Sequence, residues 1–224
     1  MTQNCLTACN FNLEFVYIFS GWEGSATDSA MFNDARLTDL HILPGKYYLA
    51  DAGFPSSLGT VIPYRGIRYH LAEWGRAGLR YVIVHYSSRI RSNCECDSPV
   101  NAEELFNLRH SSARNIIERI FGILKNRFSI LVIAPHYTMD VQARLAPALA
   151  AIHNFIRLYD PDEIKDLIDE AEDIQPGAQM PQMGDLAAGP ARAAERALAD
   201  GKRDGIAQDM WAQYQAELTE REGQ

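Results

Sequence analysis

The segment KYYLADAGFP at residues 46–55 joins a short apolar run to an acidic residue. Lys46 to Ala50 predicts a buried strand that ends at Asp51, because Gly53 and Pro55 close it off. A carboxylate at the end of a strand is one half of a candidate metal site. The competing interpretation is a simple turn or cap residue.

Two short apolar runs precede this strand. Residues 4–10 (NCLTACN) and 15–20 (FVYIFS) are separated by a polar turn and predict a hairpin. After the glycines at 21 and 24, Ser25 and Asp28 have the spacing of a capping box, which predicts a helix that runs to about Leu37.

Helical patterns fill most of the chain after residue 100. Apolar residues recur at three- and four-residue steps from Asn101 to Arg127 and predict an amphipathic helix, either continuous or broken near residues 110–112. Residues 145–159 predict a second helix, which Pro161 ends. After a stretch rich in Pro, Gly, Gln and Ala, residues 191–222 predict a mostly polar helix with one apolar stripe suited to docking.

Glu118 is the second candidate metal ligand. It lies on a face of the predicted helix that also carries Arg114 and Arg119. Two carboxylates presented by a strand end and a helix suit Mg²⁺ or Mn²⁺, hard ions that prefer oxygen ligands and keep open positions for water and phosphate. An i,i+4 ion pair between Arg114 and Glu118 is the alternative.

Charge is unevenly distributed along the chain. The net charge is −8, but residues 64–158 carry thirteen Lys/Arg against seven Asp/Glu, while the segments before and after them are acidic. Phosphate binding depends on local basic residues, so the charge of the middle segment allows it to bind DNA. The same charge is equally consistent with an ordinary solvated surface.

The amino end and the cysteines favour an intracellular protein. Residues 1–22 have no basic leader and are interrupted by polar residues, so we expect neither a signal peptide nor a membrane span. Cys5, Cys9, Cys94 and Cys96 match no zinc-binding or redox spacing, and we expect reduced structural thiols.

Five ordered blocks resemble the PIF/Harbinger branch of DDE superfamily endonucleases, its fungal members especially. They are GWEGSATDSAMF (21–32), KYYLADAGFP (46–55), PYRGIRYHLAEW (63–74), ELFNLRHSSARNIIERIFGILKNRFSIL (104–131) and LAAIHNFIR (149–157), and the tail string IAQDMWAQYQAEL (206–218) is similar to the end of such proteins. The resemblance implies an α/β fold with an RNase H-like mixed sheet, flanking helices and a helical C-terminal tail.

The resemblance also assigns the acids. In that family three acidic residues bind two divalent ions; Asp51 matches the second and Glu118 the third. The first belongs to a D-G-T-type block before the hairpin, which these residues do not contain. We therefore expect the domain to lack its first, central strand and to be impaired in catalysis. Asp28 is the nearest spare acid, and helix capping is its simpler role.

The predicted organisation has three parts. Residues 1–159 form a partial nuclease domain, 160–190 an acidic and Pro/Gly/Ala-rich linker, and 191–224 a C-terminal helix. Residues 79–98 are an atypical insertion with respect to the family, and our hypothesis is a translated intron.

Basic residues around the two acids are the predicted phosphate contacts: Arg65, Arg68, Arg109, Arg114, Arg119, Lys125 and Arg127. Tyr64, Tyr69 and Trp74 lie among the first of them, where core packing is favoured over base stacking. His153 is interpreted as a satisfied core histidine.

The predicted function is metal-dependent cleavage of DNA by a transposase-derived nuclease. The alternative is a non-catalytic remnant that binds DNA or a partner protein. The resemblance further implies a nuclear location and a separate DNA-binding partner protein.

Overall fold

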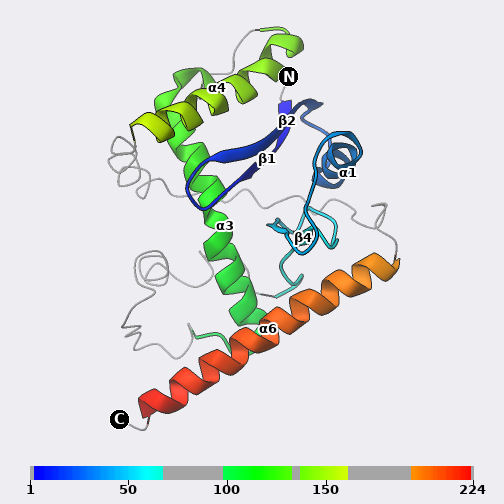
Figure 1. Ribbon diagram of the computed structural model, residues 1–224, viewed down its shortest axis with the longest axis vertical. Coiled ribbons are helices and arrows are strands. Elements are labelled where there is room, and N and C mark those ends of the chain that lie inside the picture. The colour runs from blue at the N-terminus through cyan, green and yellow to red at the C-terminus, as the bar shows by residue number, and fades with distance from the viewer. Residues whose placement is uncertain (1–2, 68–97, 133–136, 161–192, 223–224) are drawn as a thin grey trace. The chain divides into compact units, whose positions relative to one another are not determined.

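The computed structural model of the chain describes residues 3–67, 98–132, 137–160 and 193–222 (Figure 1). The chain divides into two units, Met1–Ile42 with Asn115–Pro190 and Leu43–Arg114 with Ala191–Gln224. Helix α3 (Ala102–Arg127) contributes its amino half to the second unit and its carboxyl half to the first. The predicted insertion at 79–98 lies outside the described residues except for Ser98.

The first unit begins with an antiparallel hairpin of β1 (Gln3–Cys9) and β2 (Phe15–Glu23). The apolar runs at 4–10 and 15–20 predicted this hairpin, and the structure confirms it. Bulges between Asn4 and Leu6 and between Ala8 and Cys9 shift the register, so that Leu6 faces Phe19 and Cys9 faces Phe15. Cys5 and Cys9 are free thiols, and burial raises the pKa of Cys9 to about 11.

The hairpin loop depends on one residue in an unusual conformation. Leu13 has φ 59°, in the left-handed region that residues other than glycine rarely adopt. The Asn10 side-chain oxygen accepts the amides of Asn12 and Glu14, each at 3.0 Å, so it holds the turn on both sides of Leu13. The strained backbone directs the Leu13 side chain into the core, where it is 5% exposed.

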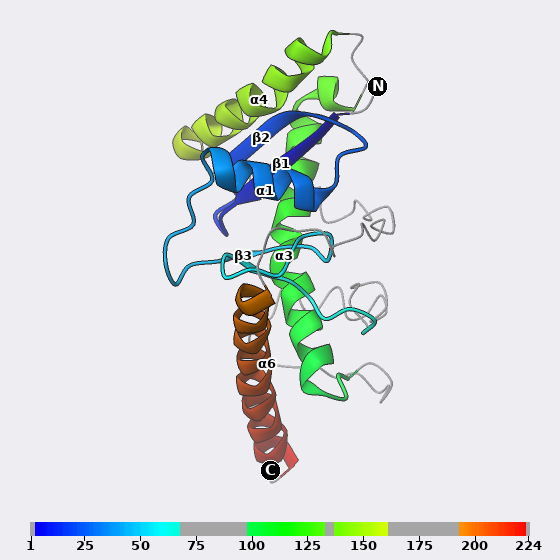
Figure 2. The ribbon, with the colours of Figure 1, turned by 90° about the vertical axis from the view of Figure 1, so that its right-hand side faces the viewer.

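Helix α1 (Asp28–Thr38) follows the hairpin and lies beside it (Figures 1 and 2). Its N-cap is Thr27, whose hydroxyl accepts the amide of Ala30 at 3.2 Å. The predicted capping box that began at Ser25 was therefore wrong by two residues. Asp28 is the first helical residue and stabilises the positive end of the helix dipole. Met31, Phe32 and Ala35 form its buried face.

The core of the first unit joins the hairpin to α3 and to α4 (Met139–Tyr159). Its buried residues are Leu13, Phe15, Ile120, Ile123, Leu124 and Ala150. Between the two helices lies a short 3-10 turn, η3 (Ser129–Leu131). Helix α4 begins six residues before the predicted Leu145, and Pro147 lies inside it although proline normally breaks a helix.

Pro147 is tolerated because another residue takes over its missing hydrogen bond. Proline has no amide hydrogen, so the carbonyl of Ala143 one turn earlier loses its helical donor. The Ser20 hydroxyl of β2 donates to that carbonyl at 2.6 Å. The hydrogen bond from Ser20 to the Ala143 carbonyl thus attaches α4 to the hairpin.

The second unit contains a small parallel sheet of β3 (Tyr48–Leu49) and β4 (Thr60–Val61). The predicted strand at 46–50 is confirmed but shorter. The amino half of α3 packs on β4 through Ala102 and Phe106, and α6 (Ala193–Glu222) packs there through Ala207, Ile206, Met210 and Trp211. The apolar stripe predicted for the C-terminal helix therefore docks in this unit.

Helix α3 is continuous, so the break left open near residues 110–112 does not occur. Three polar residues in a row would weaken an isolated helix there, but His110 and Ser111 are both buried. The Ser111 hydroxyl donates to the Leu108 carbonyl within the helix at 3.0 Å, and a His110 ring nitrogen contacts β4. Tertiary contacts thus override the local signal.

The observed elements make a mixed α/β structure that is mostly helical. The described residues form two separate two-stranded sheets, one antiparallel and one parallel. Assembly of these strands into an RNase H-like sheet stays a prediction, as do the predicted domain bounds.

Candidate metal-binding site

Asp51 lies two residues beyond the end of β3 in the second unit, at the strand end that the sequence predicted. Its side chain is partly exposed, and its Oδ1 accepts the amide of Ala52 at 2.8 Å. Its other oxygen, Oδ2, has no partner within the described part of the chain. The Ala52 amide fixes the orientation of the carboxylate and leaves an oxygen available for a cation.

His110 is the buried neighbour of this acid. Its Nε2 donates to the Val61 carbonyl at 3.0 Å, because that carbonyl only accepts. Burial lowers the pKa of His110 to about 4; the Arg114 guanidinium also lowers it, while the Val61 hydrogen bond and the Asp51 carboxylate oppose the shift. The ring is therefore neutral near pH 7 and serves as a link from α3 to β4.

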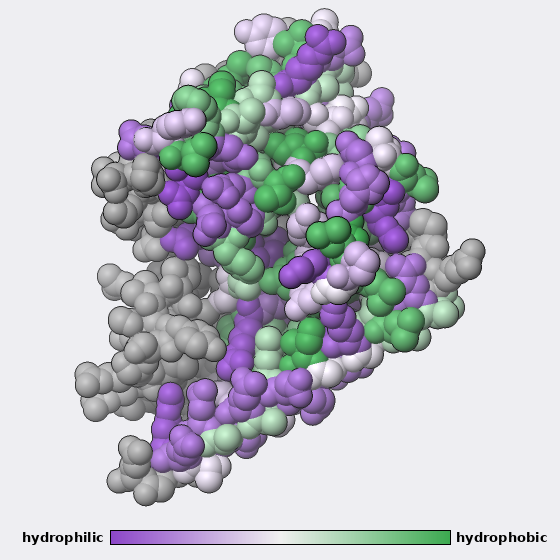
Figure 3. Space-filling model, in the orientation of Figure 1, coloured by the Kyte–Doolittle hydropathy of each residue, from purple (hydrophilic) through white to green (hydrophobic). Residues whose placement is uncertain are grey.

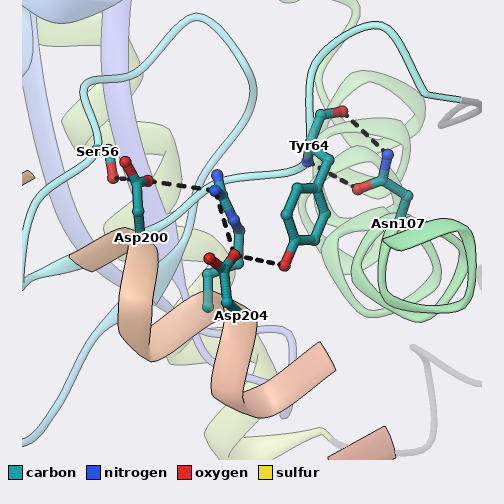
Figure 4. A network of polar contacts seen from close by, with 6 residues as sticks. Ser56, Tyr64, Asn107, Asp200 and Asp204 are labelled. Atoms are coloured by element: carbon teal, nitrogen blue, oxygen red, sulfur yellow. Dashed lines mark hydrogen bonds and ion pairs between the residues drawn. The ribbon is translucent and has the colours of Figure 1, made fainter. Parts of the chain in front are cut away.

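Asn107 fixes the segment that follows β4. Its side-chain oxygen accepts the Tyr64 amide at 2.8 Å, and its nitrogen donates to the Tyr64 carbonyl at 3.0 Å (Figure 4). Asn107 is fully buried. The next residue, Arg65, donates to the Ala52 carbonyl at 3.3 Å. A chain of polar contacts thus connects α3 to the residue beside Asp51.

Helix α6 holds the same region from another direction. The Asp204 carboxylate accepts the Tyr64 hydroxyl at 2.7 Å, and the Asp200 carboxylate accepts the Ser56 hydroxyl at 2.9 Å (Figure 4). Arg203 lies over the Tyr64 ring at 4.1 Å from its centroid. Burial raises the pKa of Tyr64 to about 12, and the Asp204 hydrogen bond adds to this while Arg203 opposes it.

Further contacts extend α6 to the residues before β3. The Lys202 ammonium lies 3.9 Å from the centroid of the Tyr47 ring. Since Tyr47 precedes Asp51 and Ser56 follows it, α6 contacts the chain on both sides of the acid. These contacts make α6 a support for the segment that carries Asp51.

No local pattern in the sequence marks Asn107, Asp200 and Asp204 as supporting residues. Asp200 and Asp204 are one turn apart on α6, a spacing that is common among solvated helical acids. Only the fold supplies their partners, Ser56 and Tyr64, more than one hundred residues away. Tyr64 packs edge-on against Phe106, 5.4 Å between centroids, which supports the prediction of core packing over base stacking at this residue. Tyr69 and Trp74 lie outside the described residues.

Glu118 lies on the carboxyl half of α3, in the first unit, and its side chain is exposed. Asp51 belongs to the second unit, so the closeness of these two carboxylates stays a prediction. Asp28, the spare acid, is partly buried at the start of α1 in the first unit. Within the described residues no group of three or more His, Cys, Asp or Glu side chains has the arrangement of a metal site.

The predicted phosphate contacts differ in exposure. Arg65 and Lys125 are exposed, whereas Arg109, Arg114 and Arg119 are partly buried. Arg68 lies outside the described residues. All of these residues stay predictions as DNA contacts.

Arg127 has an inward-facing guanidinium. Its Nε and one terminal nitrogen are buried, and the other terminal nitrogen donates to Nδ1 of His153 at 3.1 Å. His153 is fully buried, and its Nε2 donates to the Leu13 carbonyl at 2.8 Å. Arg127 as a phosphate contact stays a prediction, whereas the burial and the two hydrogen bonds of His153 confirm it as a satisfied core histidine.

The donor chemistry at the two acids fits a divalent metal ion. Carboxylate oxygens are the ligands that Mg²⁺ and Mn²⁺ prefer, and both acids have solvent-accessible side chains.

No described helix is long and apolar enough to cross a membrane.

A strand-end carboxylate, a helical carboxylate and a mixed α/β framework are typical of metal-dependent nucleases. The chain matches the DDE superfamily endonuclease family over residues 1–154. It belongs to this family, whose members generally use divalent metals and act on DNA. No curated protein and no solved structure matches the chain.

Proposed function

We propose that this chain is the nuclease domain of a transposase-derived DNA endonuclease of the PIF/Harbinger type, with Asp51 and Glu118 as two of its metal ligands. The observation that carries the proposal is the state of Asp51. It lies at a strand end within the family match and is oriented by the Ala52 amide, and its second oxygen has no partner among the residues that the structure describes. The neutral His110 beside it adds no competing positive charge.

The residues have distinct roles in this proposal. Asp51 and Glu118 would hold Mg²⁺ or Mn²⁺, which supplies Lewis-acid activation of water and neutralises phosphate charge. Exposed Arg65 and Lys125 bind the DNA backbone, with help from Arg109, Arg114 and Arg119. Asn107 and Asp204 orient the segment around Asp51 through Tyr64.

The resemblance calls for three acids, and Asp51 and Glu118 are proposed as two of them. Three carboxylates together hold the cations and position the nucleophile, so each of these two should matter for hydrolysis. We place the protein in the nucleus, with target choice by a separate DNA-binding protein, on the same resemblance.

Manganese titration tests the site without requiring turnover. Asp51→Asn and Glu118→Gln should each weaken Mn²⁺ binding about tenfold or more, as followed by the loss of free Mn²⁺ signal in electron paramagnetic resonance. The double variant should lose little more than either single variant, because both residues would bind one ion. Glu217→Gln, an exposed acid on α6, is the matched control. Independent, additive losses would contradict a shared site.

Plasmid nicking tests the activity. We expect Mg²⁺-dependent nicking that Asp51→Asn abolishes. Nicking that persists in this variant would defeat the catalytic assignment.

The alternative is a non-catalytic remnant that binds DNA, favoured by the exposed basic residues at 65 and 125. It predicts salt-dependent DNA binding in fluorescence anisotropy that Arg65→Ala and Lys125→Ala weaken, with no change on removal of Mg²⁺ and no nicking.

A further inference from the structure

Helix α4 is apolar on two opposite sides. One side, with Leu149, Ala150 and His153, is buried in the first unit. The other side carries large apolar side chains in solvent: Ile152 is 46% exposed, Phe155 62%, and Tyr159 69%. In Figure 3, hydrophobic residues appear at the surface over α4, in the upper part of the view. A contiguous exposed apolar strip of this kind marks an interaction surface.

The spacing of the exposed residues is that of a coiled-coil seam. They alternate by four and three residues, the a/d pattern of a heptad repeat. We name this strip the α4 seam, and its members are Val141, Leu145, Ala148, Ile152, Phe155 and Tyr159, of which Leu145 is partly buried and the others are exposed. The seam carries no charged residue. A heptad seam is complementary to another helix with the same repeat, which restricts the kind of partner.

We propose that the α4 seam is the interface between two copies of this chain, paired as antiparallel helices. The sizes of the side chains support self-pairing in this direction. About a two-fold axis near residue 150, Ala148 faces Ile152 of the other copy, and Val141 faces Tyr159. Leu145 faces Phe155 in the same arrangement, and the one small residue of the seam, Ala148, meets a large one, which favours close packing of the two helices.

Parallel pairing fits less well. In a parallel pair Ala148 would face Ala148 of the other copy, which leaves a gap. Phe155 would face Phe155 of the other copy, which crowds the seam. The flanking positions agree with the antiparallel arrangement, because Arg144 would lie across from Leu158, which is 68% exposed. No like charges meet there, and the aliphatic part of the arginine covers the leucine.

Oligomeric state is the first test, on the full chain by sedimentation velocity at increasing concentration. We expect a dimer that Ile152→Lys and Phe155→Lys each convert to a monomer with unchanged circular dichroism. Leu37→Lys, at an exposed apolar residue of α1 that is 85% exposed, is the matched control and should leave the dimer intact. A monomer at every concentration, or a dimer that survives both seam substitutions, overturns the proposal.

Crosslinking tests the direction of the helices. In a background with the four native cysteines replaced by serine, a mixture of Ala148→Cys chains and Ile152→Cys chains should form the mixed disulfide on mild oxidation. Either variant alone should crosslink poorly. Efficient crosslinking of Ile152→Cys with itself, without the mixed product, would overturn the antiparallel arrangement. Neither test involves metal binding or nicking, so this proposal and the proposed function stand or fall separately.

Discussion

The Nε2–H of His153 donates to the carbonyl oxygen of Leu13 at 2.8 Å, and this bond anchors the strained residue of the hairpin loop. Since Arg127 only donates, Nδ1 of His153 must accept, and the ring is neutral with its proton on Nε2. One histidine thereby connects the carboxyl end of α3, the middle of α4 and the loop between β1 and β2.

Replacement of His153 by alanine should destabilise the first unit by about 3 kcal/mol, because it opens a cavity and leaves the Leu13 carbonyl buried without a donor. Urea unfolding monitored by circular dichroism measures the change. Leu37→Ala, at the exposed position on α1, should stay within about 0.5 kcal/mol of wild type. A loss below about 1 kcal/mol would show that Leu13 holds its conformation without His153.

A double-mutant cycle should reveal the attachment of α4 to β2. Ser20→Ala removes the donor to the Ala143 carbonyl and should cost about 1 to 2 kcal/mol in the wild-type background. Pro147→Ala restores the helical amide as an alternative donor, so in that background the cost of Ser20→Ala should fall to a few tenths. Equal costs in the two backgrounds would mean that the carbonyl does not depend on Ser20.

His110 should make the second unit sensitive to acid. Its pKa is about 4 in the folded state and 6.5 in the reference state, so the neutral form is favoured by folding. This stability is complete above pH 6.5 and is lost as the pH falls toward 4, with a loss of about 2 kcal/mol between pH 7 and pH 4.5. Unfolding by guanidinium at the two pH values measures it. His110→Gln keeps a donor for Val61 without titrating, so the difference between the two proteins isolates the histidine.

Tyr64 should titrate later than an ordinary tyrosine. With a pKa of about 12, its phenol stays protonated at pH 11, where free tyrosine is mostly ionised. Carbon NMR of protein labelled at the tyrosine ring, with Tyr64→Phe to assign the signal, follows the titration. Asp204→Asn should lower the pKa without returning it to 10, since burial is the larger cause. A normal titration of Tyr64 in the wild type would argue that α6 does not hold this ring.

The main elements were predictable from the sequence because their apolar periodicity is strong. The hairpin, the long helix with Glu118 and the strand before Asp51 all follow from local patterns. The starts of α1 and α4 were not predictable. Thr27 is a better cap than Ser25 only once the helix phase is known, and Pro147 stops a helix unless a distant residue satisfies the freed carbonyl.

The two acidic residues of the candidate site were predictable from the sequence, but the residues that hold the segment around Asp51 were not. Asp51 and Glu118 could be singled out by their types and positions, and the family match includes both. The supporting contacts join residues far apart in sequence, as Tyr64 with Asp204 and Asn107 with Tyr64 show. Such pairs leave no local pattern, so only the folded chain identifies them.

Asn154 protects the free edge of β2 from pairing with a further strand. Its side-chain amide accepts the Phe15 N–H at 2.9 Å and donates to the Phe15 carbonyl at 2.8 Å, the two bonds that a neighbouring peptide group would make. A further polypeptide is therefore blocked from adding to β2 at this position, because a side chain of the same molecule has already saturated it. The substitution Asn154→Leu would leave the Phe15 N–H and carbonyl without these partners. We expect the variant to aggregate, because strands of other molecules could then pair with this edge of β2.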